Sequence, residues 1–528
     1  MISSDPTLPG LIGAHVRERG EQPALIYQGT SVTYAALAVE SQRLARGLRS
    51  LGVEAGDCVA IWMPNTPAWV AALLACARLG AIALATNTRY RSAEMANILQ
   101  RSAPKVLLLW PGFRDIDFLS ILDDVPAADL KSLTAIIAYS EDGGANLPEV
   151  FRQVPVRSYG EVASCAPLDE DASAPDAGCV IFTTSGTTKA PKFVLHDQRS
   201  IYVHANEVAP AFRYSESGTV TLGVVPFCGV YGFVTMTATL AAGAPLVVAS
   251  SFRADETIAM IKRHRITSLN LTGDMVRQVL AAAPNESAFA SVRFCGCGNG
   301  CPQYAAPAAA KGLILTGIYG SSEVQALFSR QDESVPLPER AIAGGLPASP
   351  QARVRARDLE SGAILPDGEQ GMLEISAPSM LKEYFGDEAA TRAALTEDGY
   401  FRTGDLGYTQ SDGRFVFLAR IGDVLRLSGF LVSPLEIEEI VAEHPSIAAC
   451  QVVGTEVEQA LRAVAFVLLK PGAALDESSI IEHCRARIAR YKVPLRIFRL
   501  EEYPTTVGPN GVKVRKEALR ELARELCW

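Results

Sequence analysis

The chain has 528 residues, of which 48% are hydrophobic and 20% are charged. This length exceeds what one hydrophobic core usually organises, so we expect at least two domains, and the composition excludes an intrinsically disordered protein. The 49 Lys and Arg residues are outnumbered by 58 Asp and Glu residues, which gives a net charge of -9. That balance argues against a general nucleic-acid or anionic-membrane surface.

Short apolar runs alternate with amphipathic stretches in the first part of the chain. The predicted strands are 24–27, 58–63, 81–85 and 105–109, and the predicted helices are 34–51 and 69–79. This alternation is typical of an α/β protein. The most apolar stretch, 69–85, contains Arg78 and Gly80 and is too short for a membrane span, so it predicts a buried helix.

The ends and the cysteines indicate the compartment. The first 20 residues lack a basic segment followed by an apolar one, so we expect no secretory signal and a cytoplasmic protein. Eleven cysteines without a regular framework are typical of thiols in a reducing compartment. Cys295, Cys297 and Cys301 lie close together, but no second Cys or His pair follows at zinc-finger spacing, so they are predicted as thiols rather than metal ligands.

The second half of the chain changes its rhythm. A polar, Pro-containing connector at 163–178 leads to a predicted strand at 179–183. Further strands are predicted at 372–375 and 415–418. From Ser433, a predicted N-cap followed by Pro434, the expected elements are a helix, a strand at 463–469, a helix at 477–490 and a strand at 495–500. These last elements predict a separate small α+β unit.

The segment FTTSGTTKAPKF, residues 182–193, follows one of these strands and is rich in hydroxyls and lysines. Hydroxyls and backbone N–H groups of such a loop can donate to a polyphosphate, while ammonium groups offset its charge. The glycine spacing of a Walker-type loop is absent, so a P-loop kinase or GTPase is not predicted. A polar surface loop is the alternative.

Several further motifs follow that loop in the chain. They are YGSSE at 319–323, GYFRTGDLGY at 399–408, RIGDVLRLSGFLVSPLEIEEI at 420–440 and PTTVGPNGVKVRKEALR at 504–520. In text and order these stretches resemble the adenylate-forming enzymes, which include acyl-CoA synthetases, firefly luciferase and adenylation domains of peptide synthetases. The resemblance spans nearly the whole chain, although Lys189 and Val512 stand where the family has glycine.

The resemblance implies an α/β fold. A large N-terminal domain of layered α/β subdomains with a small β-barrel-like part would cover residues 1–419, and a small, mobile α+β domain would cover 420–528. The implied hinge is Gly422, and Ser428 and Gly429 would line the coenzyme A tunnel.

The resemblance also assigns roles to single residues. The implied ATP-binding residues are Thr184, Ser185, Gly186, Thr187, Thr188, Lys192, Gly298, Asn299, Gly300, Tyr319, Gly320, Ser322, Asp405, Arg420 and Lys513. Glu323 would hold Mg2+, and Thr184, Glu323 and Lys513 would be catalytic. Lys516 is the alternative to Lys513. The implied acyl pocket contains Phe227, Gly229, Tyr231, Gln325 and Ala326, with Gly229 at the position of a family histidine.

The implied reaction joins a carboxylic acid to a thiol. The acid attacks the α-phosphate of ATP and releases pyrophosphate, and the thiol of coenzyme A then takes the acyl group from AMP. We expect a fatty or aryl monocarboxylate because no fixed cation is predicted near the acyl pocket, and dicarboxylates stay possible. Two alternatives stay open, which are transfer to a carrier-protein phosphopantetheine and a nucleotide-binding pseudoenzyme. A homodimer is also compatible with the sequence.

Overall fold

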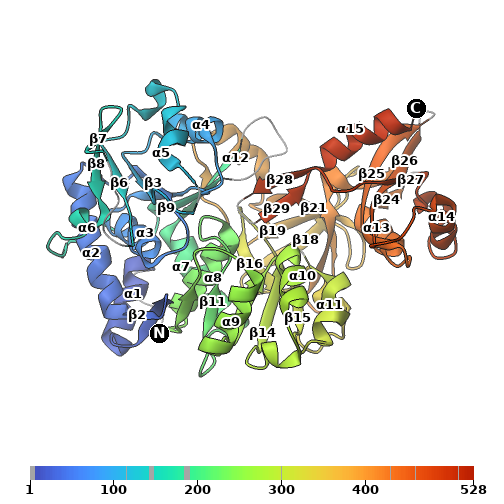
Figure 1. Ribbon diagram of the computed structural model, residues 1–528, viewed down its shortest axis with the longest axis horizontal. Coiled ribbons are helices and arrows are strands. Elements are labelled where there is room, and N and C mark those ends of the chain that lie inside the picture. Colours follow the sequence, from blue (N-terminus) through green and yellow to red (C-terminus); the bar gives the residue numbers. More distant parts are fainter. Residues whose placement is uncertain are drawn as a thin grey trace. The chain divides into compact units, whose positions relative to one another are not determined.

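The computed structural model describes residues 6–114, 116–141, 148–183, 191–298, 300–427, 430–457, 460–508 and 511–527. The chain divides into two compact units (Figure 1). The first unit comprises Met1–Arg353 and Ser376–Phe401, and the second comprises Val354–Ile375 and Arg402–Trp528. The domain boundary predicted between residues 419 and 420 stays a prediction, because these units are defined by compactness alone.

One sheet of the first unit is built mainly from parallel strands. In order across it lie β20 (Glu383–Tyr384), β10 (Phe193–Asp197), β9 (Gly178–Thr183), β4 (Ile82–Ala85), β3 (Cys58–Trp62), β5 (Val106–Leu109), β6 (Ala135–Ala138), β8 (Val154–Ser158) and β7 (Val150–Phe151). The strands from β9 to β8 are parallel, whereas β10 and β20 extend the sheet in antiparallel fashion. Every residue of β3 to β6 is buried, as expected for parallel strands covered on both faces.

A second sheet of the first unit carries the middle of the chain. Its strands are, in order, β17 (Gly344–Pro347), β16 (Gln325–Arg330), β15 (Leu315–Ser321), β14 (Phe294–Gly298), β13 (Ser268–Leu271), β11 (Thr221–Gly223), β12 (Leu246–Val248), β1 (Pro23–Tyr27) and β2 (Thr30–Thr33). The strands from β15 to β1 are parallel. The turn between β15 and β16 reverses the chain at the YGSSE motif.

Helices cover both sheets. They are α1 (Leu8–Arg19), α2 (Tyr34–Ser50), α3 (Pro67–Leu79), α4 (Ser92–Ser102), α5 (Phe118–Asp123), α6 (Tyr159–Val162), α7 (Gln198–Ala211), α8 (Val230–Ala241), α9 (Ala254–His264), α10 (Gly273–Ala282), α11 (Pro302–Ala309) and α12 (Glu388–Ala394). Thr66 is the N-cap of α3, and its hydroxyl accepts from the Trp69 N–H, while Gly80 in the left-handed region is the C-cap. Helix α3 is buried on nearly all sides, which explains its apolar sequence. No helix in the described ranges has the length and apolar character that a bilayer crossing needs.

The second unit holds the C-terminal part of the chain. Its strands are β18 (Arg353–Arg357), β19 (Gly371–Ser376), β21 (Phe401–Thr409), β22 (Phe415–Arg420), β23 (Leu425–Leu427), β24 (Phe430–Val432), β25 (Ile447–Val457), β26 (Ala460–Leu469), β27 (Arg496–Arg499), β28 (Thr505–Gly508) and β29 (Gly511–Val514). Its helices are α13 (Pro434–Ala442), α14 (Glu477–Arg485) and α15 (Lys516–Leu526). As predicted, Ser433 caps α13 and accepts a hydrogen bond from the Leu435 N–H.

One predicted helix of this unit is too long. The sequence predicts a helix over 477–490, but α14 ends at Arg485 and is followed by a turn. Ile488 and Tyr491 pack against the same core as Ile480 without belonging to the helix. The apolar spacing therefore continues past the last helical residue, and for that reason the sequence did not mark the end.

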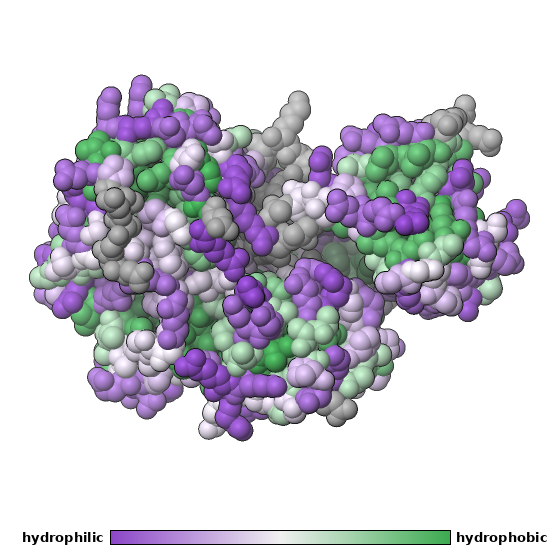
Figure 2. Space-filling view, in the orientation of Figure 1, coloured by the Kyte–Doolittle hydropathy of each residue, from purple (hydrophilic) through white to green (hydrophobic). Residues whose placement is uncertain are grey.

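A smaller hydrophobic cluster lies in the second unit around Phe466 and Leu519 of α15. Phe498 and Leu522 pack against it and are only partly buried. Hydrophobic side chains reach the surface of this unit below α15 in the view of Figure 2. The helix therefore covers its sheet incompletely on this side.

Candidate functional site

The predicted phosphate loop connects two antiparallel strands. Strands β9 and β10 pair so that Thr183 lies opposite Phe193, which makes the segment between them a hairpin connection. Thr184, Ser185, Gly186, Thr187 and Thr188 lie outside the described residues. The structure does describe the strand ends, and there the Thr183 hydroxyl lies 2.8 Å from the Tyr90 hydroxyl. Lys192 stands directly before β10.

Lys192 contacts a tyrosine that the sequence analysis did not single out. Its ammonium lies 4.5 Å from the ring centroid of Tyr384 and 3.5 Å from the Tyr384 hydroxyl oxygen. That hydroxyl donates to Oε1 of Glu323 over 3.1 Å. The structure therefore brings together a predicted phosphate ligand and the predicted metal ligand through one phenol. Tyr384 is 192 residues from Lys192 and 61 from Glu323 along the chain, so no local motif could have linked them.

The YGSSE turn has a backbone that depends on its glycine. A Cβ atom on Gly320 would lie 2.6 Å from Cα of Ala326, so no larger residue fits there. The Glu323 N–H donates to the Ser321 hydroxyl, and the Glu323 carbonyl accepts from the Leu381 N–H over 2.6 Å. Tyr319 is buried at the end of β15. These contacts fix the backbone from which the Glu323 carboxylate projects.

Two buried histidines hold the same turn. His196 of β10 places Nε2 2.7 Å from the Ser322 carbonyl oxygen, and His204 of α7 places Nε2 2.8 Å from the Ala326 carbonyl oxygen. A carbonyl only accepts, so each Nε2 carries the proton. Burial lowers the pKa of His196 and lowers the pKa of His204 to about 4. Both rings are therefore neutral donors near pH 7.

The sequence analysis left both histidines without a role, because single histidines in apolar stretches carry no motif. Their burial and their carbonyl partners were visible only in the folded chain.

Gln325 and Ala326, predicted for the acyl pocket, are buried after the turn. Gln325 has a φ of 63° and its amide nitrogen donates to the carbonyls of Ser200 and Ser379 at 3.1 and 3.3 Å. A positive φ on a bulky residue is unusual and is retained only where the surroundings impose it. The Gln325 side chain thus braces the turn, and its role at the acyl group stays a prediction.

The segment 226–232 surrounds the start of α8. Phe227 is wholly buried, packs edge-on against Trp69, and its N–H donates to the Asn65 side chain over 2.7 Å. Gly229 is the N-cap of α8. The Tyr231 hydroxyl oxygen lies 3.1 Å from the Leu271 carbonyl and 3.2 Å from the Gly296 carbonyl, so its one proton can go to either acceptor. Leu271 is the last residue of β13, and Gly296 lies in β14. Phe227 is therefore a core residue, and Tyr231 occupies the space beneath β13 and β14.

Gly298 and Tyr231 were predicted for different subsites, yet they pack against each other. A Cβ atom on Gly298 would lie 3.2 Å from the Tyr231 ring. Gly300 has a φ of 73°, which favours glycine, and Asn299 lies outside the described residues.

Two of the cysteines that were predicted as thiols lie side by side. The Cα atoms of Cys297 and Cys301 are 6.2 Å apart, a separation that a disulfide can span. Cys295 is a buried free thiol, and burial raises its pKa to about 12.

The predicted ribose ligands lie next to each other in the second unit. Asp405 of β21 is paired in register with Arg420 of β22, and Arg420 Nε lies 3.0 Å from Asp405 Oδ1. The Asp405 side chain is 2% exposed and that of Arg420 is 55% exposed. Thr403 supports both residues, because its hydroxyl accepts from the Asp405 N–H and its carbonyl accepts from Arg420 Nη1.

The predicted hinge residue, Gly422, lies in a single 3-10 turn, Ile421–Asp423. Arg520 of α15 donates to the Gly422 carbonyl over 3.0 Å and to Asp423 Oδ1 over 2.7 Å. A Cβ atom on Gly422 would meet no atom within 4 Å. Glycine is therefore not needed here for space, and the hinge role stays a prediction. Ser428 and Gly429 lie outside the described residues.

Lys513 and Lys516, the two candidates for the catalytic lysine, lie in different elements. Lys513 lies in β29, opposite Thr506 of β28. Lys516 begins α15, and its ammonium lies 3.1 Å from the buried Glu438 carboxylate. The Glu438 carboxylate also accepts from the Val452 N–H. Lys516 is thus part of the framework of the second unit, which supports Lys513 as the reactive lysine.

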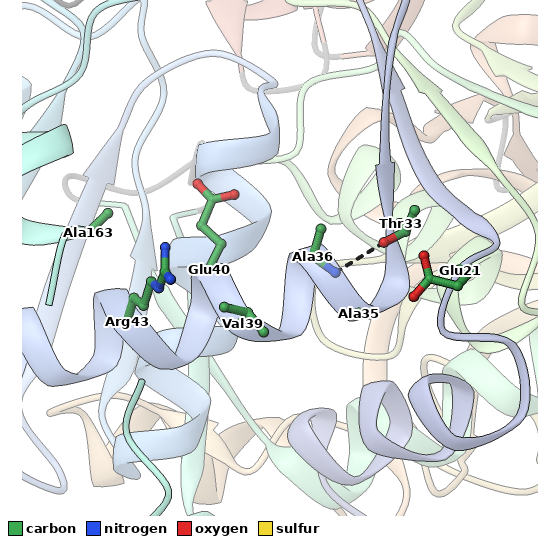
Figure 3. A pocket seen from close by; sticks show the side chains of 8 residues that line it. All are labelled: Glu21, Thr33, Ala35, Ala36, Val39, Glu40, Arg43 and Ala163. Carbon is green, nitrogen blue, oxygen red and sulfur yellow. Dashed lines mark hydrogen bonds between the residues drawn. The ribbon is translucent and has the colours of Figure 1, made fainter. Parts of the chain in front are cut away.

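A groove of about 610 Å³ runs along α2 (Figure 3). It is lined by Glu21, Thr33, Ala35, Ala36, Val39, Glu40, Arg43 and Ala163. The Thr33 hydroxyl there accepts from the Ala36 N–H and caps the helix. No predicted site residue lines this groove, so it is not part of the predicted site.

Comparison with known proteins identifies the family. A family model for AMP-binding enzymes matches residues 13–385, and one for the C-terminal domain of AMP-binding enzymes matches 436–507. The chain belongs to the AMP-binding enzyme family. This finding confirms the predicted family, the mixed α/β fold class and the enzyme class, an ATP-dependent acid–thiol ligase.

Curated relatives cover almost the whole chain. Indoleacetate–CoA ligase of Aromatoleum aromaticum is 30% identical over 96% of both proteins, and sulfoacetate–CoA ligase of Cupriavidus necator is 28% identical over 97% of both.

Solved structures confirm the fold. The anthranilate CoA ligase AuaEII in complex with anthranoyl-AMP matches with a TM-score of 0.85 at 22% identity, over 100% of this chain and 98% of that one. ATP-bound MatB from Rhodopseudomonas palustris matches with a TM-score of 0.83 at 22% identity, over 98% of this chain and 99% of that one.

Proposed function

We propose that this AMP-binding enzyme activates a monocarboxylic acid, fatty or aryl, with ATP and transfers the acyl group to coenzyme A. The acid's carboxylate forms a bond to the α-phosphate, pyrophosphate leaves, and the coenzyme A thiolate then displaces AMP. The observation that carries the proposal is the contact of Lys192 and Glu323 with one phenol beside the β9–β10 connection. A cation and a carboxylate held there suit the phosphates of MgATP.

The first step brings two anions together, so most of the catalysis is positioning and charge stabilisation. Lys192 and the loop at 184–188 would hold the β- and γ-phosphates. Lys513 would bridge the acid and the α-phosphate. Tyr319 would lie against the adenine, and Asp405 with Arg420 would bind the ribose. Asp405 and Arg420 lie opposite each other in β21 and β22, which supports the proposal that they bind the ribose together.

Mg2+ belongs to the proposal through Glu323. Magnesium prefers hard oxygen ligands and is commonly held by one or two carboxylates plus substrate phosphates. The Tyr384 hydroxyl occupies Oε1 of Glu323, and no donor among the described residues contacts Oε2. The donor set therefore fits Mg2+. When bound, the ion would offset phosphate charge, while the chain's own residues orient the carboxylate.

The acid is proposed from the surroundings of α8. Phe227 and Tyr231 place aromatic rings near the segment 226–232, and their hydrogen bonds are satisfied by the chain itself. A second anionic group would find no partner among these side chains. Indoleacetate, the acid in one relative's name, is an aryl monocarboxylate of this kind, whereas sulfoacetate carries a second charge.

The proposal also covers the acyl acceptor, the cellular location and the oligomeric state of the protein. Coenzyme A is the proposed acceptor because the two curated relatives described above, which match the chain over almost its whole length, are named CoA ligases. Transfer to a separate carrier protein is the alternative outcome. A cytoplasmic location and a homodimer are also proposed, and light scattering after gel filtration tests the dimer.

The test is ATP–pyrophosphate exchange across fatty, aryl and dicarboxylic acids, followed by mass spectrometry of products with coenzyme A or a phosphopantetheinylated carrier. We expect exchange with a fatty or aryl monocarboxylate and formation of its acyl-CoA. Absence of exchange with every acid, despite ATP binding, would favour a pseudoenzyme. An acylated carrier without acyl-CoA would change the acceptor.

A further inference from the structure

We infer that Tyr384 is a positioning residue that orients the Glu323 carboxylate for its metal and holds Lys192 directly before β10. The inference rests on the proposed function, since it concerns the same site. The sequence motifs do not include Tyr384, which lies in the segment LKEYFGD, residues 381–387.

The backbone of Tyr384 is tied to both of the elements that it would coordinate. Strand β20 pairs with β10, with Tyr384 opposite Val194, two residues after Lys192. Three residues before Tyr384, the Leu381 N–H donates to the carbonyl of Glu323 itself over 2.6 Å. The Tyr384 N–H donates to the Thr391 hydroxyl over 2.9 Å. The ring therefore projects from a short strand that is anchored on both sides of the site.

The side chain of Tyr384 is matched to two opposite charges. Its face lies 4.5 Å from the Lys192 ammonium, within the range of a cation–π interaction. Its single hydroxyl proton goes to Glu323 Oε1, so the phenol oxygen presents only lone pairs to Lys192 Nζ, 3.5 Å away. Tyr384 is 3% exposed, so these interactions are little screened by water.

The hydroxyl and the ring of Tyr384 make two separate contributions. The hydroxyl holds Oε1 of Glu323 by a hydrogen bond, and this bond also sets the direction in which Oε2 points. The ring contacts the Lys192 ammonium and carries no opposite charge of its own. Loss of the hydroxyl should then disturb the metal requirement, whereas loss of Lys192 should weaken nucleotide binding at any metal concentration.

The alternative is that Tyr384 only fills space between β20 and the YGSSE turn. A phenylalanine would serve that purpose equally well. Tyr384→Phe keeps the ring and removes the hydrogen bond to Glu323. Tyr159→Phe is the matched control, because the buried Tyr159 also donates to a carboxylate, Glu40 Oε1 at 2.7 Å, and has no part in the site.

The experiment is calorimetric titration of the full chain with ATP over a range of Mg2+ concentrations. It needs no knowledge of the acid. We expect Tyr384→Phe to raise the Mg2+ concentration for half-maximal ATP binding by about 10-fold, as for a lost hydrogen bond to a charged group. Tyr159→Phe should leave it unchanged. Lys192→Met should weaken ATP binding at saturating Mg2+ without moving the Mg2+ midpoint, and it probes the site independently should Tyr384→Phe unfold.

A double-mutant cycle decides whether Tyr384 acts through Glu323. In a Glu323→Gln background we expect Tyr384→Phe to change ATP binding by less than about 2-fold, because coupled residues are not additive. An equal effect in both backgrounds, or an unchanged Mg2+ midpoint in Tyr384→Phe, would overturn the inference while the proposed function stands. A wild-type chain that binds no ATP with Mg2+ would overturn both.

Discussion

The two compact units hold their functional residues by different means. In the first unit, neutral donors surround Glu323, with the Tyr384 hydroxyl on its carboxylate and the His196 ring on the adjoining Ser322 carbonyl. In the second unit, ion pairs hold the functional residues, one between Arg420 and Asp405 and one between Arg520 and Asp423. Buried neutral donors are insensitive to salt but respond to protonation, whereas partly exposed ion pairs respond to salt. The units should therefore fail under different conditions.

The largest expected effect comes from Lys513, the proposed catalytic lysine of the second unit. Lys513→Ala should lower the rate of ATP–pyrophosphate exchange by about 100- to 1,000-fold, because one charged donor to the transition state is removed. Exchange with the best acid of the panel, at saturating ATP, measures it. A variant that exchanges at the wild-type rate would show that another residue bridges the two anions.

Lys516→Met tests whether Lys516, the alternative catalytic lysine, stabilises the fold or takes part in the reaction. The buried Glu438 carboxylate would lose its cation, and we expect the free energy of unfolding to fall by about 1–3 kcal/mol. Urea denaturation followed by far-UV circular dichroism measures this change. Exchange activity of the folded variant should stay close to wild type. Arg524→Met, which removes a pair on the exposed face of α15, is the control and should cost less.

Acid should weaken the first unit through His204. Its pKa is about 4 in the fold, below the ordinary value of 6.5, so the unfolded chain binds the proton first as pH falls. Stability is then constant above pH 6.5 and is lost between 6.5 and about 4, amounting to about 2 kcal/mol at pH 5.

The tryptophans allow this loss to be localised. Three of the four tryptophans, Trp62, Trp69 and Trp110, belong to the first unit, so urea midpoints from tryptophan fluorescence at pH 7.5 and pH 5 report mainly on it. His204→Gln should reduce the difference between the two midpoints. An unchanged difference would mean that other groups, such as His196, carry the acid sensitivity.

The smallest expected effect concerns the turn at Gly422. Arg520→Met would remove the donor to the Gly422 carbonyl and the partner of Asp423. A partly exposed pair of this kind contributes about 0–1 kcal/mol, so we expect a change of up to about 5-fold in thioester formation, with a smaller change in pyrophosphate exchange. Raising the salt concentration should reproduce part of the effect in the wild type. Equal changes in both half-reactions would argue against a hinge at Gly422.

The sequence by itself determined the family, the alternation of strands and helices, and the chemistry-bearing motifs. These features are local, because strand and helix periods and the YGSSE and GYFRTGDLGY motifs are each contained in a few consecutive residues. Even within these limits the end of α14 was missed, since Ile488 and Tyr491 keep an apolar pattern outside the helix.

Only the tertiary structure decided how the motif residues are held. Tyr384 meets Glu323 across 61 residues of chain, and His204 meets Ala326 across 122, so neither partnership leaves a local pattern. The tertiary structure also places Cys297 beside Cys301 and pairs the Lys516 ammonium with the Glu438 carboxylate. The physical reason is that a hydrogen bond or ion pair depends on distances of a few ångströms, which strand pairing and burial set and which spacing along the chain does not encode.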